Sequence, residues 1–294
     1  MTATAIAEEY VQQTRVFADR VRELALPDIS RYYWYHTIDL GDGLVTPGLY
    51  DYRETIGDFH FPDDMRGMTV LDVGSATGFF AFEFERRGAR VISVELPSLR
   101  DLDRFPGQDV ESSLRKIERM IFPDGLKLEG LRRGDAEREL YQCLLDGPFQ
   151  FCKERLGSRV ERCYSTIYDL SAEKLRAAKL DAEFDLIFVG DVLVHTLYPL
   201  KALAALAPLC KGSLVLAQML PEGPQEPPAM MYVGGDDPDE DHISWWLPNK
   251  SCLTELFMKL GFVQVEEIGW HTGVVRPGGH PFRRIILNAR KQMP

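Results

Sequence analysis

The sequence lacks several features that mark common classes of protein. It contains no Cys-x-x-Cys pair, and its five cysteines are an odd number spread widely along the chain. This argues against a disulfide framework or a structural zinc site and fits a reducing compartment. No apolar run reaches the length of a membrane span, and the first residues lack the basic and apolar regions of a secretion signal. These absences predict a cytoplasmic protein without a membrane-spanning segment.

The chain also has no contiguous basic tract, no internal repeat and no low-complexity segment. Acidic residues outnumber basic residues by 45 to 34, which gives a formal net charge of -11. Because such a charge repels polyanions, the composition disfavours nucleic acid as a partner. No feature of the sequence indicates an oligomeric state. The 294 residues are 45% hydrophobic, so the chain can bury a large core.

Short β-rich runs alternate with helical patterns from Met68 onward. This alternation predicts an α/β fold, with a doubly wound, mostly parallel sheet of seven strands and helices on both faces. A helix is expected at 79–87, and another runs from a polar cap at 249–251 to Gly261. Strands are expected at 69–73, 91–95, 160–164, 184–190, 213–218, 262–268 and 283–289, the last two as an antiparallel pair.

Two segments are additional to this sheet. Residues 5–26 place apolar side chains on one helical stripe that ends at Pro27, so residues 1–66 are expected to form a cap helix and an aromatic segment. The main domain is expected at 67–294. It carries a helical insertion at about 100–157, where a crossover usually needs roughly 20 to 30 residues. A lid or substrate wall and a surface elaboration are both open roles for this insertion.

The stretch "VLDVGSATGFF", residues 70–80, replaces bulky side chains with glycine, serine and alanine between an apolar run and a helix. A strand, a glycine turn and a helix N-terminus bring unpaired backbone N–H groups to one point with no Cβ atoms in the way. Glu95 ends the next strand, 21 residues after Gly74, where an acid can accept both ribose hydroxyls. The pattern predicts a nucleoside site.

The residues around this turn indicate which nucleoside cofactor fits. The third glycine of the dinucleotide pattern GxGxxG is absent, because Phe79 stands in its place. Asp72 lies two residues before the first glycine and suits a cationic or amino-bearing ligand rather than a pyrophosphate. S-adenosylmethionine, which has no phosphate and carries a sulfonium and an amine, meets these requirements.

Three segments resemble the class I S-adenosylmethionine-dependent methyltransferases. "VLDVGSATGFFAFEFERRGA" is similar to their motif I, with Ala76 in place of the middle glycine, "VISVEL" to their ribose-binding strand, and "FDLIFVGDVLVH" to the fourth strand under the cofactor. The resemblance implies a Rossmann-like methyltransferase fold. It also implies cofactor contacts at Asp72, Gly74, Ser75, Ala76, Gly78, Glu95, Ile167, Tyr168 and Gly190.

A narrower resemblance covers "WYHTIDLGDGLVTPG", "VGDVLVHTLYPLKAL" and "WWLPNKSCLTELFMKLGF". These segments are similar to the transfer-RNA wobble-uridine carboxymethyl transferases and their small-molecule-acting relatives. The transfer-RNA enzymes read a carboxylated cofactor with a tyrosine just before a histidine. Val194 occupies that position here. Because valine cannot bind a carboxylate, the ordinary methyl donor is expected.

Two histidines are candidate catalytic residues for methyl transfer. His195 ends the fourth-strand segment where substrate would approach, and His36 lies in the aromatic segment. Either imidazole could take a proton from a hydroxyl or amine, and His195 could equally cap the strand end. Trp34, Tyr35 and Tyr50 are candidate substrate contacts, although aromatics between a helix and a sheet also form cores. Asp191 could orient substrate or cap the following helix.

The acidic run at 236–241 invites a metal hypothesis, but it lacks the spacing of a calcium loop, and no metal is expected. The sequence as a whole predicts an S-adenosylmethionine-dependent methyltransferase that acts on a small-molecule substrate, in specialised metabolism. Two alternatives are a methyltransferase or carboxymethyltransferase for the transfer-RNA wobble base and a cofactor-binding protein without catalysis.

Overall fold

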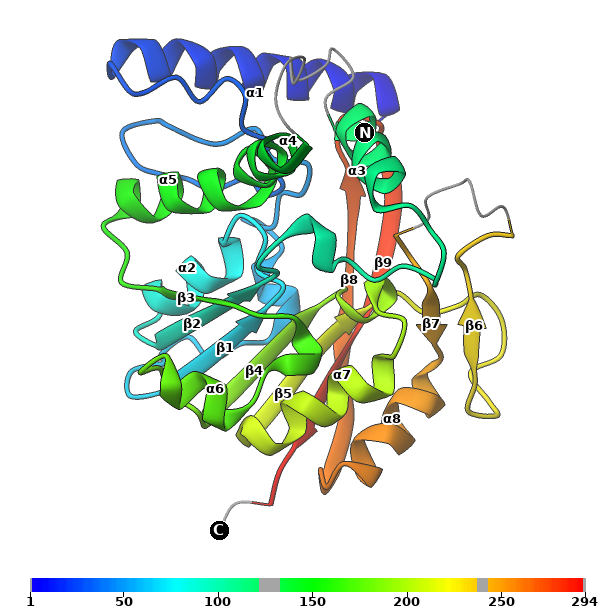
Figure 1. Cartoon of the computed structure of the whole chain (residues 1–294). Coiled ribbons are helices and arrows are strands. Elements are labelled where there is room, and N and C mark those ends of the chain that lie inside the picture. Colours follow the sequence, from blue (N-terminus) through cyan, green and yellow to red (C-terminus); the bar gives the residue numbers. More distant parts are fainter. Residues whose placement is uncertain (1, 122–132, 237–242, 293–294) are drawn as a thin grey trace.

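The computed structural model describes residues 2–121, 133–236 and 243–292. Within these residues one sheet of seven strands has the order β3-β2-β1-β4-β5-β9-β8 (Figure 1). The sheet confirms the predicted fold class. Its strands are β1 (Thr69–Val73), β2 (Arg90–Glu95), β3 (Glu161–Tyr164), β4 (Phe184–Gly190), β5 (Cys210–Gln218), β8 (Gln264–Val275) and β9 (His280–Arg290).

Strands β1 to β5 pair in parallel, whereas β9 runs antiparallel to β5 and β8 antiparallel to β9. The central strands β1 and β4 are buried along nearly their whole length. Parallel strands are covered on both faces, and this explains why "TVLDV" and "FDLIFVG" read as continuous apolar runs rather than alternating ones.

Helices cover both faces of the sheet (Figure 1). On one face Phe80 of α2 and Phe149 of α5 pack with Val70 and Phe188 of the sheet. On the other face α6, α7 and α8 pack against the alternate strand residues, among them Leu71 and Ile187. The helices are α2 (Phe79–Arg86), α5 (Gly147–Leu156), α6 (Ala172–Ala177), α7 (Pro199–Leu206) and α8 (Lys250–Lys259).

The N-terminal helix α1 (Ala3–Glu23) begins at the Thr2 cap, whose side chain accepts a hydrogen bond from the backbone N–H of Ala5. It lies across the top of the molecule in Figure 1. Its buried Phe17 meets Trp34 edge to face, with ring centroids 5.3 Å apart. Both rings belong to the same hydrophobic cluster as Phe80 and Phe188, so the first residues of the chain share a core with the sheet.

Helices fill the connection between β2 and β3, at the predicted insertion. They are α3 (Val110–Ile121), α4 (Arg133–Tyr141), a π-helical turn (Gln142–Asp146) and α5. Leu114 and Ile117 of α3 pack with Leu140 of α4 and Leu144 in a small core of their own, which also holds Leu99. The described part of the insertion is therefore a packed helical layer that rests on the sheet through α5.

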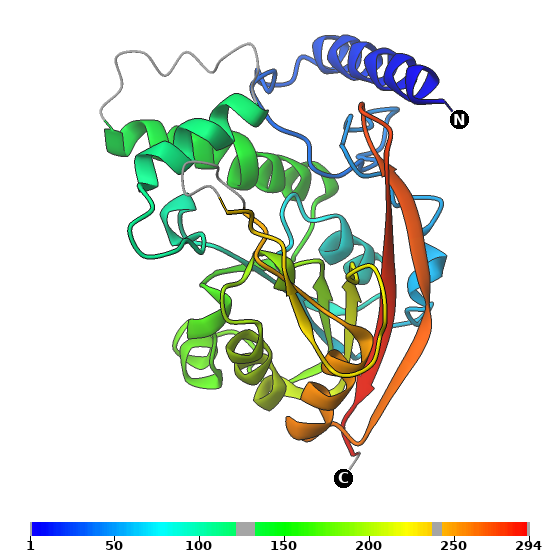
Figure 2. The ribbon, with the colours of Figure 1, turned by 90° about the vertical axis from the view of Figure 1, so that its right-hand side faces the viewer.

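The C-terminal strands are longer than the sequence predicts, because their hairpin continues past the sheet toward α1 (Figure 2). Arg276 near its tip donates a hydrogen bond of 2.7 Å from Nη1 to Gln13 Oε1 of α1. Its Nη2 also donates to Thr37 Oγ1 and to the carbonyl oxygen of Gly48. The additional residues of β8 and β9 thus gain partners outside the sheet, which strand periodicity does not reveal.

Shorter elements complete the described structure. In that part of the chain no helix combines the length and the hydropathy needed to cross a bilayer. The 3-10 turns are η1 (Ile56–Phe59), η2 (Leu99–Asp101), η4 (Ile167–Asp169), η5 (Leu193–His195) and η6 (Ala207–Leu209), and β6 (Met230–Tyr232) pairs with β7 (Trp246–Pro248) in a separate ribbon.

Candidate active site

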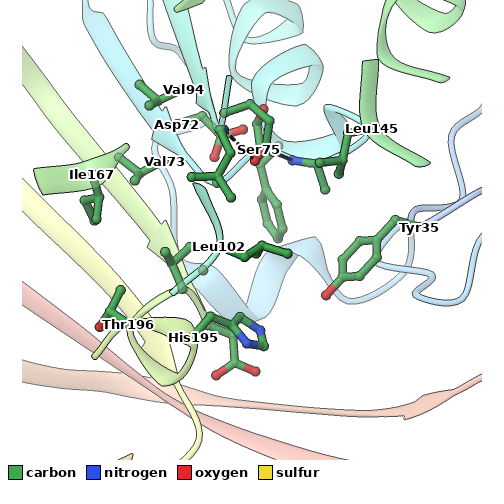
Figure 3. A pocket seen from close by; sticks show the side chains of 18 of the residues that line it. Tyr35, Asp72, Val73, Ser75, Val94, Leu102, Leu145, Ile167, His195 and Thr196 are labelled. Carbon is green, nitrogen blue, oxygen red and sulfur yellow. Dashed lines mark hydrogen bonds between the residues drawn. The ribbon is translucent and has the colours of Figure 1, made fainter. Parts of the chain in front are cut away.

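A cavity of about 310 Å³ lies where β1, β2 and β4 end at their carboxyl edge. Open α/β sheets bind ligands at this edge. Figure 3 shows Asp72, Ser75 and Val94 on one side of the cavity and His195 and Thr196 on another, with Tyr35 further across. Of the residues that the sequence singles out, the cavity is lined by Tyr35, His36, Asp72, Gly74, Ser75, Ala76, Glu95, Ile167, Tyr168, Gly190, Asp191 and His195.

The turn after β1 requires small residues for a geometric reason. Gly74 has φ 70°, and a Cβ at this position would stand 2.6 Å from Val192 Cγ2. Ala76 also lies in the left-handed region, with φ 46°, which a side chain disfavours. Its backbone is held from both sides, because its N–H donates to Glu95 Oε2 at 2.8 Å and its carbonyl accepts from Arg162 Nη1 at 3.1 Å. These bonds let alanine replace the usual glycine.

Glu95 stands at the end of β2 and is buried beside this turn. Besides the bond from Ala76, its Oε1 accepts from the backbone N–H of Leu96 at 2.9 Å, and Arg162 Nη2 lies 3.7 Å from Oε2. A carboxylate oxygen can accept more than one hydrogen bond. Glu95 therefore fixes the turn and still has acceptor capacity toward the cavity.

Asp72 is 2% exposed, and its Oδ2 has no hydrogen-bond partner in the described structure. Burial, and after it the nearby charge of Glu95, raises its pKa to about 7. A buried carboxylate oxygen without a partner is costly, so its presence at the cavity indicates a ligand that supplies a donor or a positive charge.

The wall beside β3 comes from η4 and from the loop after η2. Tyr168 Oη donates a hydrogen bond to Asp103 Oδ2, which also accepts from the backbone N–H of Leu197 at 2.6 Å. Both Asp103 and Leu102, residues of the predicted insertion, line the cavity. Asp103 therefore links the insertion to the two segments that follow β3 and β4.

The far end of the cavity contains aromatic and imidazole groups from the segment before β1. His36 is 5% exposed, its Nδ1 has no partner in the described structure, and its ring lies among those of Tyr52, Phe79 and Phe80. Burial, helped by the charge of Arg284, lowers the pKa of His36 to about 3. The imidazole is therefore neutral at physiological pH and resists protonation, so it can accept a hydrogen bond but is a weak base.

His195 lies in η5, directly after β4, and its ring is exposed toward the cavity. Its Nδ1 lies within hydrogen-bond distance of the carbonyl oxygen of Ile243. A carbonyl can only accept, so this contact places the proton on Nδ1 and leaves Nε2 as the acceptor. The geometry orients His195 in the form that a general base needs.

Three of the candidate residues do not line the cavity in the described structure. Trp34 packs into the core against Phe17, because the segment after α1 turns inward before it reaches the site. Tyr50 lies behind Tyr35, with ring centroids 4.9 Å apart. Gly78 begins α2, where a Cβ would meet the rings of Phe82 and Phe149. All three thus belong to the packing around the site and not to its lining.

Arg284 and Asp103 line the cavity but were not among the candidates from the sequence. A signal for Arg284 exists in "FRRIILNA", where an arginine interrupts a strand that is otherwise apolar. Asp103 sits in a loop without any local pattern. The acidic run proposed as a metal candidate lies, apart from Asp236, outside the described residues. Within the described residues no three His, Cys, Asp or Glu side chains gather as a metal site.

Comparison with known proteins gives one family and several distant structures. A family model described as "Methyltransferase domain" matches residues 50–267. No curated protein matched the chain. The N-terminal domain of EvdMO1 with SAH bound is 13% identical, over 90% of this chain and 93% of that one, with a TM-score of 0.49. The 1,6-didemethyltoxoflavin-N1-methyltransferase of Burkholderia thailandensis is 16% identical, over 77% and 72%, with a TM-score of 0.43.

Proposed function

This chain belongs to the methyltransferase domain family, and we propose that it transfers a methyl group from S-adenosylmethionine to a small-molecule acceptor in specialised metabolism. The observation that carries the proposal is the buried, unpartnered oxygen of Asp72 in the same cavity as Glu95 and the glycine turn. An amine facing Asp72 and a ribose facing Glu95 would satisfy both carboxylates.

The residues of the cavity fit the parts of that cofactor. The open backbone at Gly74 and Ala76 would lie against the methionine and ribose, and Ile167 and Tyr168 would flank the adenine. Gly190, at the end of β4, would leave room beneath the sulfonium. When bound, the cofactor supplies an activated methyl group on a positively charged sulfur.

The protein's own contribution is mainly position and exclusion of water. Methyl transfer is an in-line displacement, so holding the acceptor atom in line provides most of what the reaction needs. The cavity is walled by the insertion on one side and by the segment around Tyr35 on the other. His195 Nε2 would remove the acceptor's proton, whereas the low pKa of His36 leaves that second candidate as a hydrogen-bond acceptor for the substrate.

Two features support a small acceptor over transfer RNA. The cavity of about 310 Å³ must also hold the cofactor, and the net charge of -11 opposes a polyanion. Val194 bears instead on the form of the donor, because it stands where the transfer-RNA enzymes have the tyrosine that reads a carboxylate. Its side chain is buried, and its carbonyl accepts a hydrogen bond of 2.6 Å from the backbone N–H of Trp245. A salt-sensitive affinity for transfer RNA would favour the RNA alternative instead.

Calorimetry with S-adenosylmethionine and S-adenosylhomocysteine tests the cofactor assignment, and mass spectrometry of ligand that co-purifies with the protein identifies what the cell supplies. Replacing Glu95 with alanine should weaken binding by about 1.5 to 3 kcal/mol, the usual worth of charge-assisted hydrogen bonds. Glu161→Ala is the control, since the carboxylate of Glu161 in β3 is partly exposed and pairs with Arg90 outside the cavity. Equal affinity of Glu95→Ala and the unaltered protein would place the ribose elsewhere.

Turnover separates an enzyme from a cofactor-binding protein. We expect methyl transfer from labelled S-adenosylmethionine to at least one member of a broad panel of small hydroxyl- and amine-bearing acceptors. Tight cofactor binding with no transfer to any acceptor would favour the non-catalytic alternative.

A further inference from the structure

The far end of the cavity contains one buried pair of opposite charges. Arg284 Nε donates to Asp191 Oδ2 at 2.7 Å, and Arg284 Nη1 donates to Tyr52 Oη at 2.8 Å. The side chains of Arg284 and Asp191 are only 6% and 14% exposed, yet both line the cavity. Any molecule that fills this end therefore contacts a positive and a negative group together.

Both members of the pair are held in place independently. Asp191 has φ 55° at the end of β4, where its N–H donates to the carbonyl of Ala217 at 2.7 Å. Its Oδ1 accepts from the backbone N–H of Met219 at 3.1 Å. The guanidinium of Arg284 lies 4.1 Å from the ring centroid of Phe282. The pair is thus part of the fixed wall and not a flexible surface contact.

Four polar side chains that the described structure packs around this pair are uncharged at neutral pH. Burial raises the pKa of Tyr35 well above its ordinary value and that of Tyr52 to about 12, and it lowers the pKa of His36 to about 3. Burial also lowers the pKa of His271, whose ring lies 5.2 Å from that of Tyr52. Among the described residues, Arg284 and Asp191 are thus a pair of opposite charges in direct contact, and their charges cancel.

The remaining wall is apolar and aromatic. Tyr35, Tyr52, Phe59 and Phe80 all line the cavity, and the rings of Phe59 and Phe80 lie 6.0 and 5.0 Å from that of Tyr52. Flat aromatic side chains favour a flat ligand, because rings pack edge to face or offset against one another. A charged ligand would gain from one member of the ion pair and be repelled by the other, and it would lose its hydration as well.

Resting on the proposed function, we propose that the acceptor is an uncharged aromatic molecule with a hydroxyl or amine group, and that Asp191 determines this specificity by neutralising Arg284. Without the carboxylate of Asp191, the guanidinium of Arg284 would be a buried positive charge facing the cavity. Such a charge binds carboxylates. Asp191 is then a specificity-determining residue whose removal converts the site from one for neutral ligands into one for anions.

Benzamide and benzoate test this inference, because they have nearly the same shape and differ in charge. Their dissociation constants are measured by NMR titration, with and without S-adenosylhomocysteine. In the unaltered protein, we expect benzamide to bind about tenfold or more tightly than benzoate. In Asp191→Asn, which keeps the shape and removes the charge, the order should reverse.

Two further variants separate charge from structure. In Asp51→Asn a carboxylate that pairs with Arg53 outside the cavity loses its charge, and the preference for benzamide should stay. Combining Asp191→Asn with Arg284→Gln removes both charges and should restore that preference. A carboxylate with only a structural role would leave the benzamide-to-benzoate ratio unchanged in every variant.

The experiment distinguishes failure of this inference from failure of the cofactor assignment. Calorimetry with S-adenosylhomocysteine reports separately on the cofactor end and shows whether each variant is folded. If Asp191→Asn does not fold, the ratio of the benzamide and benzoate dissociation constants in the unaltered protein still tests whether the site prefers an uncharged ligand. A preference for benzoate there, binding of neither probe, or the same ratio in folded Asp191→Asn would overturn the inference.

Discussion

At the scale of single residues, the proposed contact of Asp72 with the cofactor would couple cofactor binding to release of a proton. Its pKa of about 7 in the free protein means that it is largely protonated below neutral pH. A cationic amine beside it favours the carboxylate, so binding should release a proton. We expect affinity for S-adenosylmethionine to rise between about pH 6 and pH 8. Calorimetry in buffers of different ionisation enthalpy measures the released proton, and Asp72→Asn should abolish it.

The same residue affects stability in the opposite direction. Folding raises the pKa of Asp72 from its ordinary value of 3.8 to about 7. Its contribution to the free energy of unfolding is therefore fully present below about pH 4 and is lost as pH rises through 7. Ligand binding above pH 7 compensates for this loss, because the amine replaces the missing proton.

His195 is the second residue for which the geometry gives a direct prediction. We expect His195→Ala to lower turnover by about 10²-fold or more, the usual contribution of a positioned base, while affinity for S-adenosylmethionine changes little. Steady-state rates and calorimetry measure the two quantities. The matched control is His280→Ala, an exposed histidine at the start of β9 outside the cavity. A normal rate in His195→Ala would show that His195 has a structural role and is not the base.

At the scale of elements, Asp103 attaches the insertion to the wall of the cavity. Its carboxylate joins the loop after η2 to Tyr168 and to the N–H of Leu197. Asp103→Ala should weaken cofactor affinity by about 1 to 3 kcal/mol, because two hydrogen bonds to a carboxylate are lost. Tyr168→Phe removes one of the two and should show a smaller loss.

Hydrogen exchange adds a readout that affinity alone does not give. We expect the amides of residues 99–109 to exchange faster in Asp103→Ala, since the loop loses its attachment to the segments after β3 and β4. Unchanged exchange and unchanged affinity together would show that the insertion is only a surface elaboration.

Most of the sheet could be predicted from the sequence. The apolar runs that became β1 and β4 begin and end at the predicted residues, because buried parallel strands leave a strong continuous pattern. The hairpin of β8 and β9 extends beyond its prediction, since Arg276 and its neighbours find partners in distant segments. Local sequence patterns do not reveal contacts between segments that are distant in the sequence.

The residues of the cavity likewise divide into those that local sequence patterns predict and those that distant contacts place. Gly74 and Glu95 follow from strand ends and turn geometry, which are local. Trp34 does not, because whether an aromatic faces the core or a ligand depends on how the segment after α1 packs. Arg284 was missed for the same reason, since its place in the cavity depends on pairing between β9 and β5.

At the scale of the whole molecule, the segment before the sheet is part of the main core. The family model begins at residue 50, yet Phe17, Trp34 and Leu44 pack in one cluster with Phe80 and Phe188 of α2 and β4. The division into a cap at 1–66 and a domain at 67–294 stays a prediction. The shared cluster indicates that the two parts depend on each other for stability.

Removing residues 1–49 tests this dependence. The shortened chain would uncover Phe79 and Phe80, whose rings pack against His36, so we expect it to lose cooperative thermal unfolding or to aggregate. Circular dichroism and light scattering measure both. The milder variant Phe17→Ala should lower the free energy of unfolding by about 3 to 5 kcal/mol. A shortened chain that melts as sharply as the full one would mean that the segment is only an attachment.

The hairpin that carries Arg276 and Arg284 is synthesised late, and this affects when each wall of the cavity can form on the ribosome. Asp72, Glu95, Tyr168 and Gly190 are all translated before residue 191, whereas the opposite wall needs Tyr35 from the start of the chain and Arg284 from near its end. The residues proposed to bind the nucleoside would therefore all be present early in synthesis. The wall proposed to select the acceptor would close only after β9 emerges, so on this proposal a partly synthesised polypeptide could hold the donor without being able to use it.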